Sequence, residues 1–258
     1  MPPVHDAAQR GFSAEASTYT SGRPDYPAAL EGWLRGTLGI VPALPVLDLG
    51  AGTGKFTRLL AGLQANVTAV EPVAAMRDEL SLGLPKVPVL DGTAQGIPLG
   101  DQTVQVVTCA QAFHWFATAA ALAEIHRVLA PGGRLGLVWN VRDESVDWVA
   151  AITAILTPYE GDAPRFHTGL WRQAFDGHYF SEPRVATFEH THEGSPEDVI
   201  LGRCLSVSFI AALPQAEKNA VAAQLRELVA THPALRGRET VAFPYQTQAY
   251  GFVKQPHG

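Results

Sequence analysis

The feature that most constrains the fold is VLDLGAGTGKFT, residues 46–57, in which an apolar run leads into glycines at alternate positions. These are Gly50, Gly52 and Gly54, and a helical pattern follows them directly. Glycines let the backbone turn sharply and approach a ligand closely. Ligands of open α/β sheets bind at the carboxyl ends of the strands, so the segment predicts a strand, a binding loop and a helix. A glycine-rich turn without a ligand remains the alternative.

The same alternation continues through residues 44–140. The predicted strands read PVLDL, ANVTAV, KVPVL, VQVVTCA and RLGLVWN, and helices are predicted after Gly54, around Met76 to Leu80, and from Ala117 to Ala130. Near-continuous apolar strands that alternate with helices are typical of an α/β fold. In such a fold, helices cover both faces of a mostly parallel sheet. Residues 145–230 read as mainly helical, apart from the strand-like run VATFEHT, and the chain ends with VAFPYQTQAYGFVK.

Two common phosphate-binding patterns fail at specific positions of the loop. A dinucleotide loop would place its third glycine at Lys55, and a P-loop would need Ser or Thr at Phe56 and glycine at Leu49. Glu71 ends the next predicted strand, about 20 residues after the loop, where a carboxylate can reach a ribose diol. Glu71 fits a dinucleotide equally well, so the glycine spacing is what excludes one. A surface carboxylate at a strand end is the structural alternative.

Four segments in order carry a resemblance: VLDLGAGTGKFT, VTAVEPVAAM, DGTAQGIPLGDQTVQVVTCAQAFHWF and HRVLAPGGRLGLVWN. The chain resembles class I S-adenosylmethionine-dependent methyltransferases over roughly residues 10–140, and more weakly to its end. AFHWF and the start F…A…Y…RPDYP resemble the branch with trans-aconitate-type small-molecule methyltransferases. The resemblance implies a Rossmann-like, doubly wound, mostly parallel seven-stranded sheet with an antiparallel C-terminal strand and a helical cap.

The resemblance also implies an organisation for the chain. One domain would span residues 1–258, with N-terminal lid helices in 1–38, the cofactor-binding core in 44–140, and the cap with the last two strands in 141–258. In the first segment, Leu30, Trp33, Leu34 and Leu38 share one helical face, with Asp25 as the predicted cap and Pro27 in the first turn.

S-adenosylmethionine is the cofactor that this resemblance implies. Its methionine part would meet Asp48, Gly50, Ala51 and Gly52, its ribose Glu71 and Pro72, and its adenine Met76, Thr93, Ala94 and Gln95, with Gln111 facing it from the end of a strand. Tyr19 and Arg23 would close over it, and Arg23 would pair with the methionine carboxylate. Thr93 stands where many members have an acid, and Gln95 where Glu is frequent, which leaves the contacts of both residues open.

Two residues are the candidates for handling the acceptor. His114 could take a proton from a hydroxyl, since imidazole titrates near neutral pH, and Arg142 could recognise an anion. Packing beside the cofactor is the alternative for His114. Ser206, Ser208 and Phe209 are further candidates for the pocket wall. His190 and His192 share a strand face, but no third ligand accompanies them, so we expect no metal.

Composition narrows the partners. The net charge of −6 and the absence of a Lys/Arg cluster disfavour nucleic acid, because binding to phosphates needs a basic face. No apolar run is long enough to cross a bilayer, and the start lacks the apolar core of a secretory signal. Cys109 and Cys204 lie far apart, as in a reduced cytoplasmic protein. We expect a small-molecule acceptor, no membrane and no nucleic acid, and a homodimer stays open.

The function predicted is therefore methylation of a small molecule, on a carboxylate or hydroxyl oxygen. The alternative is a non-catalytic sensor or accessory protein that binds S-adenosylmethionine. A nicotinamide-dependent oxidoreductase is disfavoured because Lys55 stands where a dinucleotide-binding loop has its third glycine. A nucleic-acid methyltransferase is disfavoured by the charge and by AQAF, which stands where an NPPY-like segment would follow the fourth strand.

Overall fold

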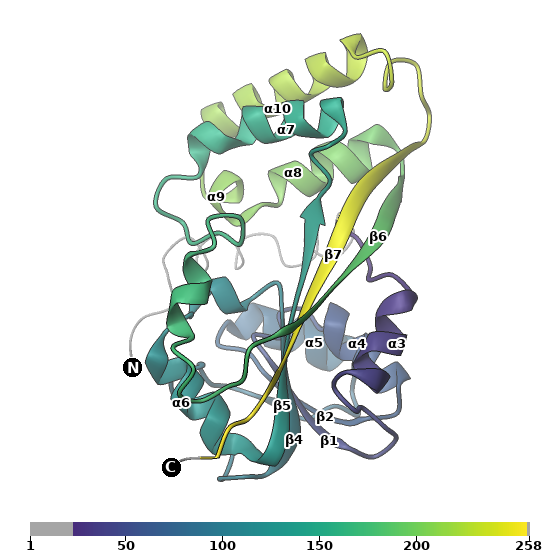
Figure 1. Ribbon diagram of the computed structural model, residues 1–258. Helices are drawn as coiled ribbons and strands as arrows, with labels where there is room; N and C mark the ends of the chain where they lie inside the picture. Colours follow the sequence, from purple (N-terminus) through teal and green to yellow (C-terminus); the bar gives the residue numbers. More distant parts are fainter. Residues whose placement is uncertain (1–22, 257–258) are drawn as a thin grey trace.

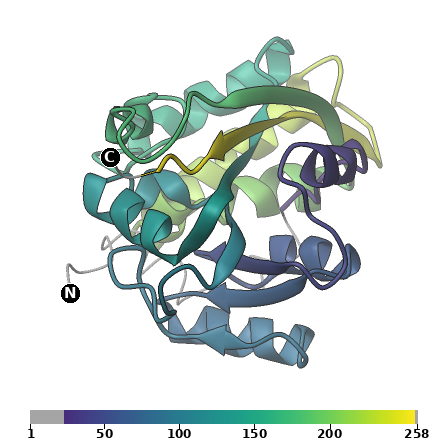
Figure 2. The same ribbon diagram turned by 60° about the horizontal axis from the view of Figure 1, so that its bottom comes forward.

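The computed structural model describes residues 23–256, whose elements are labelled in Figure 1. In this range the strands form one sheet in the order β3-β2-β1-β4-β5-β7-β6. The strands are β1 (Pro45–Leu49), β2 (Asn66–Val70), β3 (Val89–Leu90), β4 (Val104–Ala110), β5 (Leu129–Arg142), β6 (Arg184–Gly194) and β7 (Val241–Val253). Strand β7 lies between β5 and β6 and runs antiparallel to both of them (Figure 2). The predicted fold class is confirmed.

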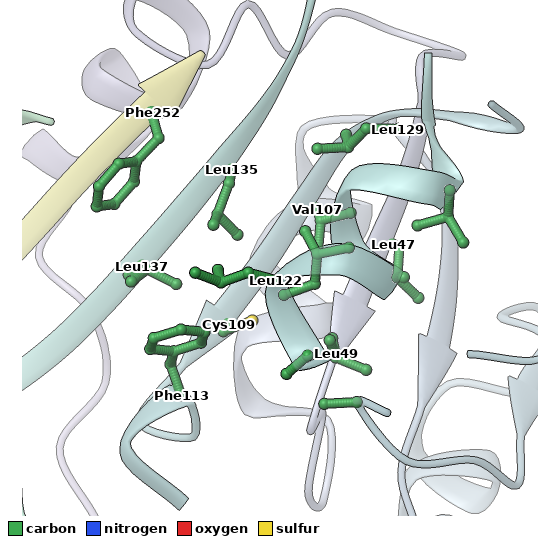
Figure 3. Close-up of a cluster of buried hydrophobic side chains, with 14 of the residues drawn as sticks. Leu47, Leu49, Val107, Cys109, Phe113, Leu122, Leu129, Leu135, Leu137 and Phe252 are labelled. Atoms are coloured by element: carbon green, nitrogen blue, oxygen red, sulfur yellow. The ribbon is translucent and has the colours of Figure 1, made fainter. Parts of the chain in front are cut away.

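Helices cover both faces of the sheet because successive side chains of a strand point to opposite sides. Leu47 and Leu49 of β1 pack on the face that α6 (Ala119–Val128) covers, and Figure 3 shows Leu122 of that helix over the sheet. Val46 points to the other face, against α3 (Ala29–Gly36) and α4 (Lys55–Gly62). Helix α5 (Ala74–Gly83) follows β2 and contacts β3. The sheet is therefore doubly wound.

The start of α3 differs from the prediction. Its apolar stripe is buried as expected, and Leu30 and Leu34 have no exposed surface. However, the N-cap residue is Ala28, and no side chain caps the helix. Asp25 lies too far before the first turn to reach its amides, and its carboxylate forms an ion pair with Lys55 at 3.0 Å instead. The predicted cap at Asp25 was wrong.

A helical cap stands at one end of the sheet (Figure 1). It consists of α7 (Asp147–Leu156), the π-helix η4 (Glu197–Gly202), α8 (Arg203–Leu205), α9 (Ser208–Ala211) and α10 (Gln215–Thr231). Strands β5, β6 and β7 rise into it, and Phe243 and Tyr245 of β7 join the same apolar cluster as these helices. The short helices η1 (Phe113–Trp115), η2 (Thr157–Tyr159) and η3 (Leu170–Ala174) complete the described elements.

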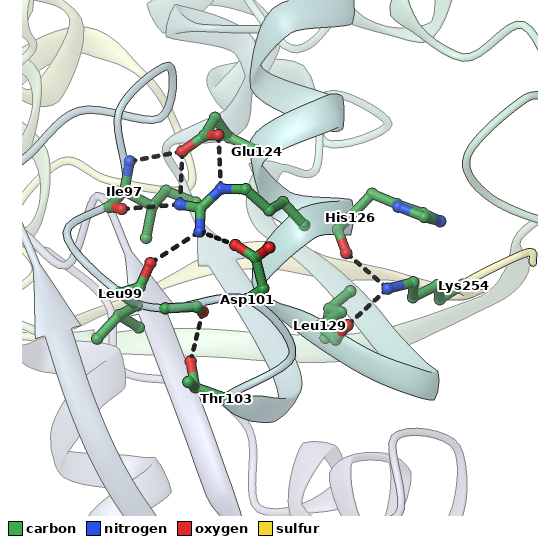
Figure 4. A network of polar contacts seen from close by, with 10 residues as sticks. Ile97, Leu99, Asp101, Thr103, Glu124, His126, Leu129 and Lys254 are labelled. Carbon is green, nitrogen blue, oxygen red and sulfur yellow. Dashed lines mark hydrogen bonds and ion pairs between the residues drawn. The ribbon is translucent and has the colours of Figure 1, made fainter. Parts of the chain in front are cut away.

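A polar network fixes the loop before β4 (Figure 4). The Arg127 guanidinium forms ion pairs with Glu124 and Asp101, both at 2.8 Å. It also donates hydrogen bonds to the carbonyl oxygens of Ile97 and Leu99, at 3.0 and 2.9 Å. These contacts anchor the chain directly after the segment that borders the cavity described below.

Candidate active site

The glycine loop lies at the carboxyl end of β1 and adopts a conformation that only glycine accepts readily. Gly50, Gly52 and Gly54 have φ angles of +70°, +57° and +85°. Residues with a Cβ atom pay a steric penalty in this left-handed region. A Cβ atom on Gly50 would also lie 2.8 Å from the Cβ atom of Ala112. Both the turn and the close approach of the segment after β4 therefore require glycine at Gly50.

Glu71 is held rigidly at the end of β2. Its two carboxylate oxygens accept hydrogen bonds from the backbone N–H groups of Gly52 and Val73, each at 2.9 Å. Desolvation by burial raises the pKa of Glu71, and these two N–H groups with the Arg77 guanidinium oppose that rise. The side chain lines the cavity above the glycine loop. A carboxylate has about four acceptor sites, so Glu71 keeps the capacity to bind a diol.

Asp48 has a different place from the one expected. It is 1% exposed and does not line the cavity. Its carboxylate accepts hydrogen bonds from the hydroxyls of Thr57 at 2.7 Å and Thr108 at 3.1 Å. Desolvation is the main cause that raises its pKa to about 6. Asp48 therefore joins β1 to α4 and β4 beneath the loop, and it positions the loop without facing the cavity.

Most of the predicted cofactor contacts meet in one cavity. Its lining includes Arg23, Gly50, Ala51, Gly52, Glu71, Pro72, Met76, Thr93, Ala94, Gln95 and Gln111. Gln111 follows β4 with a φ of +60°, a strained conformation for a residue with a side chain, and such strain is frequent at functional sites. Tyr19 lies outside the described residues.

Residues 23–26 cross one side of this cavity. The Lys55 ammonium pairs with Asp25 and donates a hydrogen bond to the carbonyl oxygen of Arg23. The Asn140 amide donates to the carbonyl oxygen of Asp25 at 3.0 Å, and it accepts from the Thr247 hydroxyl at 2.6 Å. Lys55, where the dinucleotide pattern fails, thus fastens the N-terminal segment to α4.

His114 lies beside the cavity and is absent from its lining, whereas Trp115 and Phe116 are part of it. The Nδ1 atom of His114 accepts a hydrogen bond from the Trp139 indole at 3.1 Å. Desolvation, with smaller effects of Arg165 and Arg23, lowers the pKa of His114 to about 3. A general base works best with a pKa near the operating pH. Proton abstraction by His114 stays a prediction that these surroundings do not favour.

The cap contributes a residue that sequence analysis missed. Arg142, the expected anion-binding residue, is partly buried at the end of β5 and is absent from the cavity lining. Arg203 lines the cavity in its place. It stands at the beginning of RCLSVSFIAAL, the segment from which Ser206, Ser208 and Phe209 were expected in the wall. These three residues are buried and do not line it.

Two further properties concern residues 23–256. No helix in this part of the chain is both long and apolar enough to cross a membrane. Nor does this part hold a group of three His, Cys, Asp or Glu side chains placed to bind a metal ion. The rings of His190 and His192 lie on β6 with their Nε2 atoms buried and without a hydrogen-bond partner in the described residues.

Known proteins resemble the chain in sequence and fold. The methyltransferase domain family matches residues 47–137. An uncharacterized methyltransferase-like protein of Schizosaccharomyces pombe is 38% identical over 95% of this chain and 96% of its own length. An uncharacterized methyltransferase of Mycobacterium tuberculosis is 39% identical over 92% of each chain. The solved phosphoethanolamine N-methyltransferase 2 of Haemonchus contortus has a TM-score of 0.56 at 13% identity, covering 99% of this chain and 61% of that one.

The sheet order, with a glycine loop after β1 and an acid after β2, defines a class I methyltransferase fold. The relatives then identify the family. This chain belongs to the S-adenosylmethionine-dependent methyltransferases, and it is an enzyme of that class. Membership of the trans-aconitate-type branch stays a prediction.

The residues of the cavity fit the cofactor of this family. The hydroxyl of Thr93 is buried and has no hydrogen-bond partner among residues 23–256, although it borders the cavity. Buried polar atoms are normally paired, so this oxygen indicates a ligand with a polar edge. Gly50 and Gly52 line the cavity without side chains, and Glu71 presents a fixed carboxylate. The Thr93 hydroxyl suits adenine, the glycine loop suits the methionine part, and the Glu71 carboxylate suits the ribose.

Proposed function

We propose that this methyltransferase acts on an oxygen atom of a small molecule, and that a carboxylate is favoured over a hydroxyl. The cavity that holds Glu71 and Thr93 continues to Trp115 and to Arg203 of the cap. One continuous cavity therefore borders both the predicted cofactor residues and the cap. The net charge of −6 supports a small acceptor over a nucleic acid.

Each group of residues would have its own role in holding the cofactor. Glu71 would accept hydrogen bonds from the ribose hydroxyls, and Thr93 would bind the edge of the adenine. Arg23, whose backbone Lys55 fixes beside the loop, would pair with the methionine carboxylate. When bound, S-adenosylmethionine supplies a methyl group on a positively charged sulfur. Transfer of that methyl group to a carboxylate would give a neutral ester and S-adenosylhomocysteine, so that no proton would have to be removed.

The surroundings of His114 are the observation that favours a carboxylate. A carboxylate is ionised at neutral pH and needs no base, whereas a hydroxyl benefits from one. His114 is the predicted base, and burial is the main cause that lowers its pKa to about 3. The protein then acts mainly by aligning the acceptor oxygen with the methyl group and excluding water. Alignment of this kind can lower a barrier by about 7–11 kcal/mol.

The test is a screen of purified protein with radiolabelled S-adenosylmethionine against small acids, phenols and amines. We expect S-adenosylhomocysteine to bind with a Kd near 1 μM, which corresponds to about −8 kcal/mol. Transfer to acids would yield methyl esters, which mild alkali hydrolyses with release of radiolabelled methanol. Alkali-stable products from phenols or amines alone would contradict the carboxylate proposal. Binding of the product cofactor with no transfer to any class would favour a sensor.

We also propose a cytoplasmic location. Cys109 and Cys204 are free, buried thiols, as is usual in a reducing compartment. Fractionation of cells that produce the protein would test this directly.

A further inference from the structure

We infer that Arg203, with Arg165 beside it, forms the subsite that binds an oxyanion of the acceptor, a carboxylate or a phosphate. This inference rests on the proposed function, because it assigns a substrate class to the same cavity. It differs from the sequence-based expectation, which placed the anion at Arg142.

Arg203 faces the cavity from the cap with hydrogen-bonding capacity to spare. It is the first residue of α8, directly after the π-helix η4, and π-helical turns are frequent at functional sites. Its Nε and Nη1 atoms are buried, and neither has a hydrogen-bond partner within residues 23–256. The Tyr245 hydroxyl on β7 is buried next to Arg203, and hydrogen bonding with that guanidinium opposes the rise that burial causes in the pKa of Tyr245. A guanidinium at a cavity wall with buried, unpaired N–H groups indicates a ligand.

Arg165 does not line the cavity itself and adds a second positive charge near Arg203. Its side chain is 19% exposed, and its Cζ atom lies 4.7 Å from the centre of the Phe209 ring, which holds the guanidinium plane in position. Arg142 and Arg203 both lie near enough to lower the pKa of Arg165, although desolvation is the larger cause. The three arginines, Arg142, Arg165 and Arg203, are called the arginine cluster below.

The charges of the arginine cluster are only partly compensated. Glu160 pairs with Arg165 at 3.3 Å and also lies 3.6 Å from His167. No ion pair between a described carboxylate and Arg142 or Arg203 is found in residues 23–256. Burying cations without counter-charges is unfavourable, and an anion from solution would remove that cost.

The chemistry of the cluster favours an oxyanion in particular. A guanidinium presents a planar fork of N–H donors that matches the geometry of a carboxylate or phosphate. The Tyr245 hydroxyl can donate one further hydrogen bond. A neutral amide of the same shape would leave the positive charge uncompensated. The subsite should therefore discriminate by charge.

The experiment measures binding to protein saturated with S-adenosylhomocysteine, so that no turnover is needed. The probes are succinate, its uncharged analogue succinamide, and inorganic phosphate, each followed by calorimetry at constant ionic strength. We expect succinate or phosphate to bind and succinamide not to bind. Arg203→Met should weaken that binding at least tenfold, while the affinity for S-adenosylhomocysteine changes less than threefold. The affinity of Arg203→Lys for the anion should lie between those of the wild type and of Arg203→Met.

Two further variants control for folding and for general charge. Arg236→Met removes an exposed arginine elsewhere on the surface and should leave anion binding unchanged. Arg165→Met provides an independent test if Arg203→Met does not fold, and it should also weaken binding several-fold. Preference for succinate would identify an organic acid, and preference for phosphate a phosphate ester; both support the subsite.

Three outcomes would overturn the inference. Anion binding that survives both Arg203→Met and Arg165→Met would place the anion elsewhere. A large loss of S-adenosylhomocysteine affinity in Arg203→Met, with succinate binding intact, would assign Arg203 to the cofactor. Equal binding of succinamide would exclude recognition by charge. Failure of the proposed function would look different, because unmodified protein would then bind anions and transfer no methyl group.

Discussion

The cofactor side and the cap side of the cavity differ in how their buried polar groups are satisfied. Asp48 and Glu71, on the cofactor side, each accept two hydrogen bonds from the protein itself. Arg203, on the cap side, has two buried nitrogen atoms, Nε and Nη1, without a partner in the described residues. The cofactor side is therefore preorganised by its own contacts, with Thr93 as its exception. The cap side is complete only when a ligand supplies the missing charge and acceptors.

The largest effect is expected from changing the preorganised loop. Gly50→Ala should destabilise the protein by about 2–5 kcal/mol, the sum of a left-handed backbone penalty and overpacking against Ala112. Gly132 has a similar φ of +71° but open space around its Cβ position. Gly132→Ala should therefore cost only about 1–2 kcal/mol. Urea unfolding of both variants measures the difference, and equal losses would mean that close packing around the loop does not matter.

The second prediction tests Glu71 as a ligand group. Glu71→Gln should weaken binding of S-adenosylhomocysteine by about 1.5–3 kcal/mol, since a hydrogen bond to a charged acceptor is lost. The fold should persist, because the amide oxygen can still accept from one backbone N–H group. Glu79→Gln, on the exposed side of α5, is the matched control. Calorimetry that shows the same affinity for both variants would remove Glu71 from the site.

The third prediction concerns His114, at the boundary between the two sides. Its pKa in the folded protein is about 3, below the ordinary value of 6.5. The unfolded chain thus takes up the proton first, so the stability contributed by neutral His114 is complete above pH 6.5 and is lost as pH falls toward 3. Between pH 6.5 and 5 the wild type should lose about 1.6 kcal/mol more than His114→Gln. Parallel pH profiles of the two unfolding free energies would show that His114 titrates normally.

The smallest effect is expected at Thr93, where the cofactor side resembles the cap side. Thr93→Val replaces an unpaired buried hydroxyl with a methyl group of the same shape. The free protein should keep or slightly gain stability, whereas binding of S-adenosylhomocysteine should weaken by about 0.5–1.5 kcal/mol. Thermal unfolding without the ligand measures the change in stability, and thermal unfolding with the ligand measures the loss of binding. A loss of stability without ligand would show that the hydroxyl already has a partner.

Much of the cofactor side could be predicted because its determinants are close together in the sequence. The spacing of Gly50, Gly52 and Gly54 reflects a backbone conformation that few other residues adopt, and Glu71 follows the next strand. Alternating strands and helices likewise predicted the sheet. The ends were less certain: the helix predicted to run from Ala117 to Ala130 stops at Val128, and β5 begins at Leu129.

The sequence by itself therefore determined the class of fold, the family and the place of the cofactor, because local periodicity and glycine conformation decide them. Only the tertiary structure decided which side chains meet across long separations. Thr108 reaches Asp48 from β4, Trp139 donates a hydrogen bond to His114, and Arg203 lines the cavity while Arg142 stays outside it. No pattern in a single segment reports such pairings, because they depend on how the strands and the cap pack together.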